Sequence, residues 1–210
     1  MVKNIIFDLS EVILYGFYYK TGEIIENNTS ITKEEFIEGI DNKAIDIFFD
    51  AMRGKYTEDK YIEALLNETK WEISKDNLKK YIRQSLNIQV EGTMKIIKKL
   101  KERYNLILLS DHIKEWVDYI IETNKEIEIF EHKYFSYEYG KLKTDEGTFR
   151  HIIEQEKIIP SETIFIDDSE ENVEIAKQNG IYAIVFKDAK QLESDFDKMI
   201  KILNESNKLN

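Results

Sequence analysis

The stretch that decides the fold is NIIFDLSEVI, residues 4–13. A short apolar run with two isoleucines and a phenylalanine ends at Asp8, and the chain becomes apolar again at Val12, after a polar break at Ser10 and Glu11. Short, apolar, β-branched runs of this kind are typical of strands buried within a sheet. The pattern therefore predicts a buried strand with the carboxylate of Asp8 at its end, where the charge needs compensation.

Similar runs recur along the chain, and helical patterns separate the later ones. We expect strands at residues 4–8, 106–110, 133–136, 163–167 and 182–186, and helices at 93–104, 115–123, 146–155 and 170–179. Alternating strands and helices predict an α/β fold with a doubly wound parallel sheet. Ligands of such sheets bind beyond the carboxyl ends of the strands, which makes Asp8, Ser110 and Asp167 the first candidates for a site.

The segment from residue 15 to residue 90 breaks this alternation. It contains no convincing strand and at least three amphipathic stretches, at residues 31–40, 57–69 and 74–86, with Thr32, Thr57 and Ser74 as expected N-caps. We therefore expect a core domain of residues 1–14 and 91–210 and an inserted helical subdomain of residues 15–90. The last twenty residues suit a surface helix that presents Leu192, Phe196, Ile200 and Leu203 on one face, followed by a polar tail.

Composition narrows the class of protein. The 210 residues are 42% hydrophobic, which is ample for a packed core, and 30 basic against 41 acidic side chains leave a net charge of −11. Such a charge disfavours nucleic acid and anionic lipid as partners. The chain lacks cysteine, a signal-peptide pattern and any run long enough to span a membrane, so we expect a cytoplasmic protein with no disulfide framework.

Asp167 and Asp168 end a second expected strand in TIFIDDSEEN. Adjacent carboxylates at a strand end raise the free energy of a site unless a cation or a proton relieves them. Because the chain has no cysteine and only three scattered histidines, we expect a hard cation with oxygen ligands, and Mg²⁺ is the first choice.

Ser110 and Lys143 complete the set of candidate residues. Ser110 ends the strand NLILLS before a helix, and Lys143 brings a positive charge close to another helix. A carboxylate, a hydroxyl, an ammonium and a carboxylate pair together suit an anionic group bound through a metal, which is what phosphoryl transfer requires.

These residues, taken in order, resemble the four motifs of the haloacid dehalogenase (HAD) superfamily: Asp8 in FDLSEV, Ser110 in LLSD, Lys143 in GKLK, and the aspartate pair in FIDDSEEN. The helical insertion is similar to the small cap of the subfamily that includes sugar-phosphate phosphatases with an FDLGNV-type first motif. The resemblance implies a phosphomonoesterase that acts on a small phosphorylated metabolite.

The resemblance also implies a role for each residue. Asp8 would attack phosphorus to give an aspartyl-phosphate. Mg²⁺ would be held by Asp8, the main-chain carbonyl of Ser10, Asp168 and, directly or through water, Asp167. Ser110 would bind a phosphoryl oxygen, and Lys143 would neutralise Asp8 and the phosphoryl charge. Asn172 would steady Lys143.

Three positions depart from the family pattern. Ser10 stands where the phosphatases usually have a second aspartate that acts as acid and base, so we expect slow turnover; Glu11 replaces it only if the turn directs it at the leaving group. Asp111 follows Ser110 where asparagine is common, and it either adds negative charge to the anion site or caps the next helix. No proline follows Lys143.

Other interpretations remain open. A non-aspartate at position 10 also suits a carbon–halogen hydrolase, although such enzymes need no metal, and a non-catalytic protein that binds a phosphorylated ligand or a protein partner is a third possibility. The receiver domain of two-component signalling is excluded, because its acidic pair follows the first strand. We expect structural roles for His132 and His151, and the same for His112 unless its position two residues beyond Ser110 brings it to the site. The aromatic cluster at residues 15–19 either lines a pocket or packs between the two parts of the chain.

Overall fold

The computed structural model describes residues 1–206, in which a five-stranded sheet has the order β3-β2-β1-β4-β5 with every pair of neighbours parallel. The expected α/β fold is confirmed, and the predicted strand limits differ from the observed ones by at most one residue at either end. The strands are β1 (Asn4–Phe7), β2 (Asn105–Ser110), β3 (His132–Phe135), β4 (Thr163–Asp167) and β5 (Tyr182–Val185).

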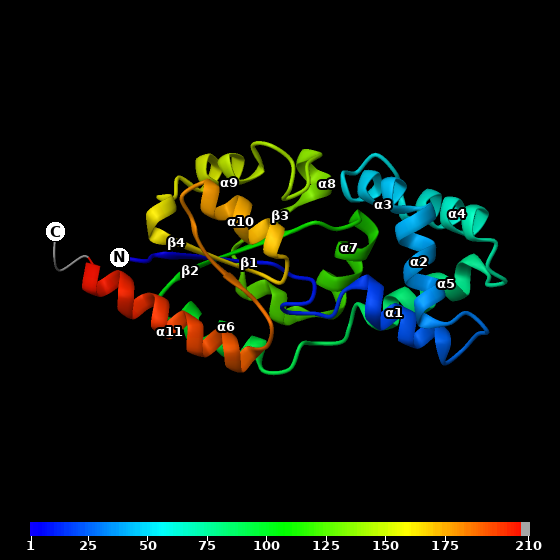
Figure 1. Cartoon of the computed structure of the whole chain (residues 1–210), viewed down its shortest axis with the longest axis horizontal. Coiled ribbons are helices and arrows are strands. Elements are labelled where there is room, and N and C mark those ends of the chain that lie inside the picture. Colours follow the sequence, from blue (N-terminus) through cyan, green and yellow to red (C-terminus); the bar gives the residue numbers. More distant parts are fainter. Residues whose placement is uncertain (207–210) are drawn as a thin grey trace.

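Alternate side chains of the strands face two different helical layers. Ile5 and Phe7 belong to one buried cluster, whereas Ile6 between them belongs to another, as the period of two in a strand requires. Helices α6 (Thr93–Lys101), α7 (Lys114–Thr123) and α11 (Ala189–Ser206) cover the first face. Helices α9 (Thr148–Glu156) and α10 (Glu170–Gln178) cover the second, so that the sheet is buried between two layers (Figure 1).

Several helix limits depart from the predicted ones. Helix α6 ends three residues early, at Lys101, and α9 begins two residues late, because Gly147 adopts a left-handed conformation with φ 85° and ends the preceding loop there. Helix α8 (Ser136–Tyr139) and the 3₁₀ segments η1 (Lys125–Ile129) and η2 (Pro160–Glu162) are short additions. Residues 207–210 of the expected polar tail lie outside the described part of the chain.

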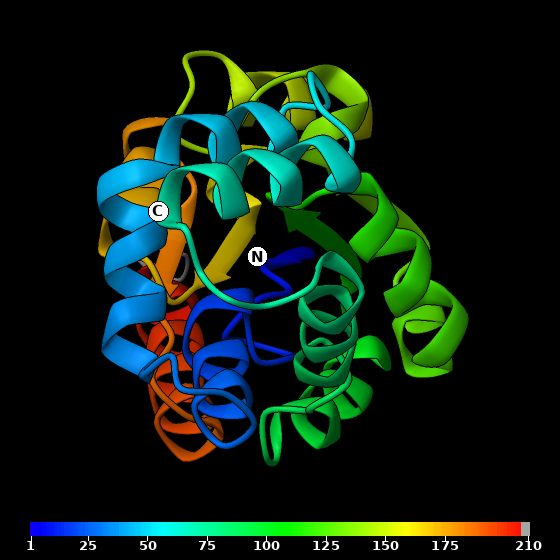
Figure 2. The same ribbon diagram turned by 90° about the vertical axis from the view of Figure 1, so that its right-hand side faces the viewer.

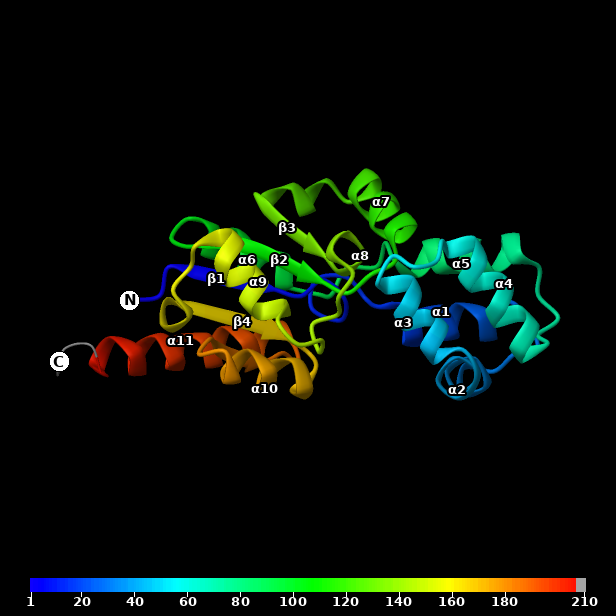
Figure 3. The ribbon, with the colours of Figure 1, turned by 90° about the horizontal axis from the view of Figure 1, so that it is seen from above.

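Five helices form a second group beyond the carboxyl ends of the strands (Figures 1 and 3). They are α1 (Phe17–Glu26), α2 (Lys33–Lys43), α3 (Ile45–Met52), α4 (Glu58–Thr69) and α5 (Lys75–Ser85). Seen end-on in Figure 2, they lie between the viewer and the strand arrows. Side chains of Thr32, Thr57 and Ser74 accept main-chain hydrogen bonds at the starts of α2, α4 and α5, as expected of N-caps.

Helices α1 and α3 were not among the predicted stretches. The α1 sequence FYYKTGEIIE is rich in aromatic and β-branched residues and contains glycine, all of which have modest helix propensity. Packing explains the helix, since Phe17 contacts the rings of Phe36, Phe48 and Trp116 at centroid distances of 5.5, 5.4 and 4.7 Å. Tertiary burial thus overrides local propensity here.

Specific polar contacts join this helical group to the rest of the chain. Both guanidinium nitrogens Nε and Nη2 of Arg53, after α3, lie 2.8 Å from the carboxylate oxygens of Asp145. The Trp116 indole of α7 donates to Glu58 Oε1 at 2.7 Å, and Ser136 Oγ donates to the Met52 carbonyl at 2.6 Å. Among the described residues, no helix is long and apolar enough to span a membrane.

Candidate active site

Asp8 directly follows β1, the central strand of the sheet. Its main-chain N–H donates to the carbonyl of Ile166 on β4 at 2.9 Å, and its Oδ1 accepts from the Leu9 N–H at 2.7 Å. Because β2 and β4 flank β1, their ends bring Ser110 and Asp167 to either side of this carboxylate. The parallel sheet thus gathers the three strand ends that the sequence singled out.

The three aspartates form a compact acidic cluster. One carboxylate oxygen from each of Asp8, Asp167 and Asp168 lies within 4.8 Å of the other two. Asp8 and Asp167 are buried, whereas Asp168 is exposed at the mouth of the site. A hard divalent cation prefers such a set of oxygen ligands.

Lys143 lies beneath two of these carboxylates. Its Nζ is 2.8 Å from Asp8 Oδ1 and 2.7 Å from Asp167 Oδ2, and its side chain is 4% exposed. A fully buried ammonium needs such partners, because the desolvation of an unpaired charge costs several kcal/mol. One ammonium cannot balance three carboxylates, so the cluster keeps an excess of negative charge.

The pKa values reflect this excess. Burial, together with the charges of Asp167 and Asp168, raises the pKa of the Asp8 carboxyl well above its ordinary value, although Lys143 acts in the opposite direction. Burial and Asp167 raise the pKa of Asp168 to about 6. Burial alone would lower the pKa of the Lys143 ammonium, but Asp167 and Asp8 outweigh it and raise that pKa. The donor set therefore fits a divalent cation, which would relieve the repulsion.

Two buried polar atoms beside this cluster lack a partner. Ser110 Oγ and His112 Nδ1 make no hydrogen bond with any described residue, although Ser110 is fully buried and His112 is 4% exposed. Such atoms are costly in a folded protein unless a ligand or water satisfies them. The Ser110 hydroxyl at the end of β2 is therefore unpaired among the described residues, and its predicted contact with an anion stays a prediction. Helix α7 starts at Lys114, one residue earlier than predicted, and three residues separate Ser110 from it.

Asn172 contacts a different residue from the one predicted, whereas of the two alternatives for Asp111 the negative charge near the site remains, because Asp111 lines the pocket and does not cap α7. Asn172 Nδ2 donates to Asp167 Oδ1 at 3.1 Å, so it steadies the aspartate that binds Lys143 rather than the lysine itself. Asp111 does not cap α7, because both its oxygens accept from the main-chain N–H of Lys143 at 3.1 and 3.0 Å. It thereby holds the loop that carries the lysine.

Ser10 and Glu11 occupy the turn after Asp8. Ser10 lines the same pocket as Asp168, and Glu11 adopts a left-handed conformation with φ 58°, which is strained for a residue other than glycine. Glu11 Oε1 accepts from the Gly16 N–H at 2.9 Å, and a Cβ at position 16 would come within 2.9 Å of that same oxygen. The turn thus directs the Glu11 carboxylate towards Gly16.

A pocket of about 390 Å³ opens above the acidic cluster. Its base includes Ser10, Asp111, His112 and Asp168, and its walls come from α1, α2, α3 and Trp116 of α7. Phe17, Tyr18 and Tyr19 line it, and Phe17 also packs against Trp116 and Phe48. The aromatic cluster therefore serves both of the purposes considered for it. This volume suits a small metabolite.

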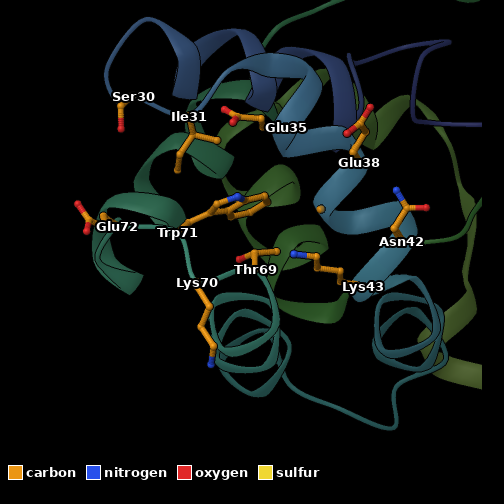
Figure 4. Close-up of a pocket in the computed structure, with 11 residues that line it drawn as sticks. Ser30, Ile31, Glu35, Glu38, Asn42, Lys43, Thr69, Lys70, Trp71 and Glu72 are labelled. Carbon is orange, nitrogen blue, oxygen red and sulfur yellow. The ribbon is translucent and has the colours of Figure 1, made fainter.

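A second pocket, of about 440 Å³, lies within the helical group and contains none of the strand-end residues (Figure 4). Trp71 lies across it with Glu35, Glu38 and Lys43 around it, and a Cβ at Gly39 would meet the Trp71 ring. These charged side chains come from the exposed face of α2, and nothing about the pocket indicates a reaction.

Some residues of the site carried no sequence signal. Trp116, Tyr18 and Asp41 line the pocket but come from three different helices, so only the tertiary fold brings them to the acidic cluster. His112 also lines the pocket, as its position two residues beyond Ser110 allowed. His132 is exposed beside Glu156, and His151 packs against Tyr139 at a centroid distance of 5.4 Å, in agreement with structural roles.

Sheet, acidic cluster and buried lysine define the class of protein. Residues 2–180 match the family model of haloacid dehalogenase-like hydrolases, and the chain belongs to that family. The predicted family membership is thus confirmed.

Individual relatives agree with this assignment. A D-ribitol-5-phosphate phosphatase from Bacteroides thetaiotaomicron is 25% identical over 193 residues, which cover 86% of this chain and 89% of that protein. A variant of a HAD family enzyme from the same organism, in complex with magnesium and inorganic phosphate, has a TM-score of 0.70 at 25% identity and covers 90% of this chain and 95% of its own.

More distant structures share the fold. A HAD-like family hydrolase from Porphyromonas gingivalis has a TM-score of 0.73 at 21% identity and covers 95% of this chain and 98% of its own. L-2-haloacid dehalogenase from Xanthobacter autotrophicus, with chloropropionic acid covalently bound, has a TM-score of 0.66 at 15% identity over 87% of this chain and 76% of its own.

Proposed function

We propose that this protein is a Mg²⁺-dependent phosphomonoesterase that acts on a small phosphorylated metabolite. The observation that carries the proposal is the acidic cluster of Asp8, Asp167 and Asp168 with Lys143 buried beneath it and the unpartnered Ser110 hydroxyl beside it. The relative that acts as a sugar-alcohol phosphatase and the related enzyme that binds magnesium and phosphate support it.

Asp8 is the proposed nucleophile. Its free oxygen attacks phosphorus, the bond between phosphorus and the ester oxygen breaks, and the alcohol leaves with a proton taken from water. A second water then attacks the phosphorus of the aspartyl-phosphate, releases phosphate and restores the carboxylate. Lys143 favours the ionised form of Asp8 against the opposing effect of burial, and the Ser110 hydroxyl donates to a phosphoryl oxygen.

Asp8, Asp168, Asp167 and the main-chain carbonyl of Ser10 are the proposed ligands of Mg²⁺. When bound, the ion supplies positive charge that offsets both the carboxylates and the phosphoryl oxygens. We further propose that residues 15–90 form the cap over this site and residues 1–14 with 91–210 form the core.

Slow turnover follows from Ser10. A hydroxyl with an alcohol-like pKa is a poor proton donor near neutral pH, and general acid catalysis is worth about 10² to 10⁴-fold. Glu11 is an unsuitable substitute, because the Gly16 N–H already engages its carboxylate. The second candidate function, which Ser10 and Asp111 favour, is a non-catalytic protein that binds a phosphorylated ligand or a protein partner.

A panel of phosphorylated metabolites tests the proposal. Purified protein with Mg²⁺ should release inorganic phosphate from at least one of them, and EDTA should stop the release. Phosphate monoesters that raise the thermal midpoint without any release would favour the non-catalytic binder. Halide release from a 2-haloacid that survives EDTA would instead favour carbon–halogen hydrolysis.

A further inference from the structure

We infer that the pocket selects phosphate monoesters whose alcohol carries no second anionic group, and that Asp41 makes this selection. The inference rests on the proposed function, since it concerns the leaving-group side of the same site. It goes further by naming the charge that the substrate must lack and the residue that excludes it.

The charges that line the pocket all have the same sign. Its lining contains four carboxylates, those of Glu11, Asp41, Asp111 and Asp168, and no lysine or arginine. His112, which also lines it, is neutral, because burial and then Lys143 lower the pKa of the imidazole to about 3. A second phosphate or a carboxylate on the substrate would meet no positive partner in this lining.

Three of these four carboxylates are already committed elsewhere. Asp111 accepts from the Lys143 main chain, and Glu11 accepts from Gly16. Asp168 belongs to the acidic cluster at the base. Asp41 is the remaining one, and it belongs to the wall that α2 contributes, apart from the strand ends at the base.

Tyr18 lies close to Asp41. Burial and then the nearby Asp41 carboxylate raise the pKa of the Tyr18 phenol well above its usual value. Both residues line the pocket beside Tyr19 and Ile37. A tyrosine and a carboxylate side by side offer an acceptor for hydroxyl or ammonium groups, while the aromatic walls cover the carbon skeleton.

Basic side chains on the surrounding helices form ion pairs with carboxylates that do not line the pocket. Lys20 of α1 and Lys33 of α2 lie 2.9 and 3.1 Å from Glu23, and Arg53 is paired with Asp145. Arg83 of α5 donates to both oxygens of Glu58. None of these cations lines the pocket, although Lys20 and Arg53 lie near enough to Glu11 and Asp111 to act on their charges.

Glycerol-3-phosphate and 3-phosphoglycerate form a matched pair of probes, because they differ at the far end by a hydroxymethyl group against a carboxylate. With Mg²⁺, wild-type protein should show kcat/KM at least about tenfold higher for glycerol-3-phosphate. The ratio of the two kcat/KM values should fall as the salt concentration is raised, because Asp41 is exposed and salt screens its charge. Phosphocholine carries a cationic group on its alcohol and D-ribitol-5-phosphate carries only hydroxyl groups, so their kcat/KM values compare a cationic with a neutral leaving group.

Asp41→Asn keeps the shape of the side chain and removes its charge. We expect the ratio of the two kcat/KM values to fall about threefold to fivefold, the effect of one charge at short range in high dielectric. Glu38→Gln is the matched control, since Glu38 lies on the same helix but lines the pocket of Figure 4 and should leave the ratio unchanged.

Binding separates failure of this inference from failure of the proposed function. Thermal stabilisation of the Asp8→Asn protein by each probe with Mg²⁺ measures selection even without turnover. Equal or stronger binding of 3-phosphoglycerate would overturn the inference while leaving the phosphatase activity intact. An Asp41→Asn ratio identical to wild type would overturn the role of Asp41.

Discussion

Lys143 Nζ lies 2.8 Å from Asp8 Oδ1, and both side chains are about 95% buried. The contact joins the end of the central strand to a loop 135 residues further along the chain, which Asp111 holds through the Lys143 main chain. This ion pair therefore links Asp8, the proposed nucleophile, to the buried Lys143 ammonium. The same ammonium also pairs with Asp167 of the acidic cluster.

Replacing Lys143 by methionine should destabilise the metal-free protein by about 3 kcal/mol or more, because Asp8 and Asp167 would lose their buried counter-charge. Urea unfolding at neutral pH measures this loss. Lys99→Met is the control, because Lys99 is 60% exposed and pairs with Glu193 on the surface. Equal stability of the two variants would contradict the buried pairing.

Asp168 provides a test for the metal site. Its pKa of about 6 means that the metal-free folded protein binds its proton more tightly than the unfolded chain, so charged Asp168 opposes folding as pH rises through about 4 to 6. Mg²⁺ should therefore raise the thermal midpoint more at pH 7.5 than at pH 5. A midpoint shift that is as large at pH 5 would count against the acidic cluster as the binding site.

The Asp168→Asn variant extends that test. Without Mg²⁺ it should be more stable than wild type at pH 7.5, since one of three repelling carboxylates is gone. With Mg²⁺ it should gain little, whereas wild type gains roughly 3 kcal/mol at a concentration about a hundred times the Kd. Undiminished stabilisation of the variant would exclude Asp168 as a ligand.

Because serine stands at position 10, a carboxyl group placed there should make the enzyme faster. Ser10→Asp should raise kcat by about 10²-fold, because it restores a carboxyl group that can protonate the leaving alcohol. Ser10→Asn has a similar shape without the proton and should not. Glu11→Gln should cost far less than Asp8→Asn in the wild-type background. A large loss in Glu11→Gln, with no gain in Ser10→Asp, would show that Glu11 already acts as the acid.

The buried His112 should make the free energy of unfolding sensitive to acid. Its folded-state pKa of about 3 lies below the ordinary value of 6.5, so only the unfolded chain takes up this proton between those pH values. Stability should fall as pH is lowered through that range, by at most about 1.4 kcal/mol per pH unit. His112→Leu should show a shallower dependence in urea unfolding measured from pH 7 to pH 4. Parallel curves would refute the buried neutral imidazole.

The sequence predicted the sheet and the strand-end residues because both follow local patterns. Apolar runs ending in Asp8, Ser110 and Asp167 are visible in the letters, and parallel strands must bring their carboxyl ends to one edge. The family resemblance supplied the order of the motifs. This part of the site was therefore predictable without coordinates.

Contacts made through the main chain or across the two parts of the molecule were not predictable. Whether Asp111 would cap α7 or bind the Lys143 N–H depends on the path of a loop, and the partner of Asn172 depends on a rotamer. Helix α1 exists because Phe17 is buried among rings from other helices, a long-range effect that no local propensity encodes.

Phosphate release by wild type and Asp8→Asn, measured side by side with Mg²⁺ on the best ester of the panel, tests the central claim most directly. Asn keeps the size of the side chain but cannot attack phosphorus, so kcat should fall by at least about 10³-fold while the variant remains folded and still binds the ester. Equal rates for the two proteins would contradict Asp8 as the nucleophile.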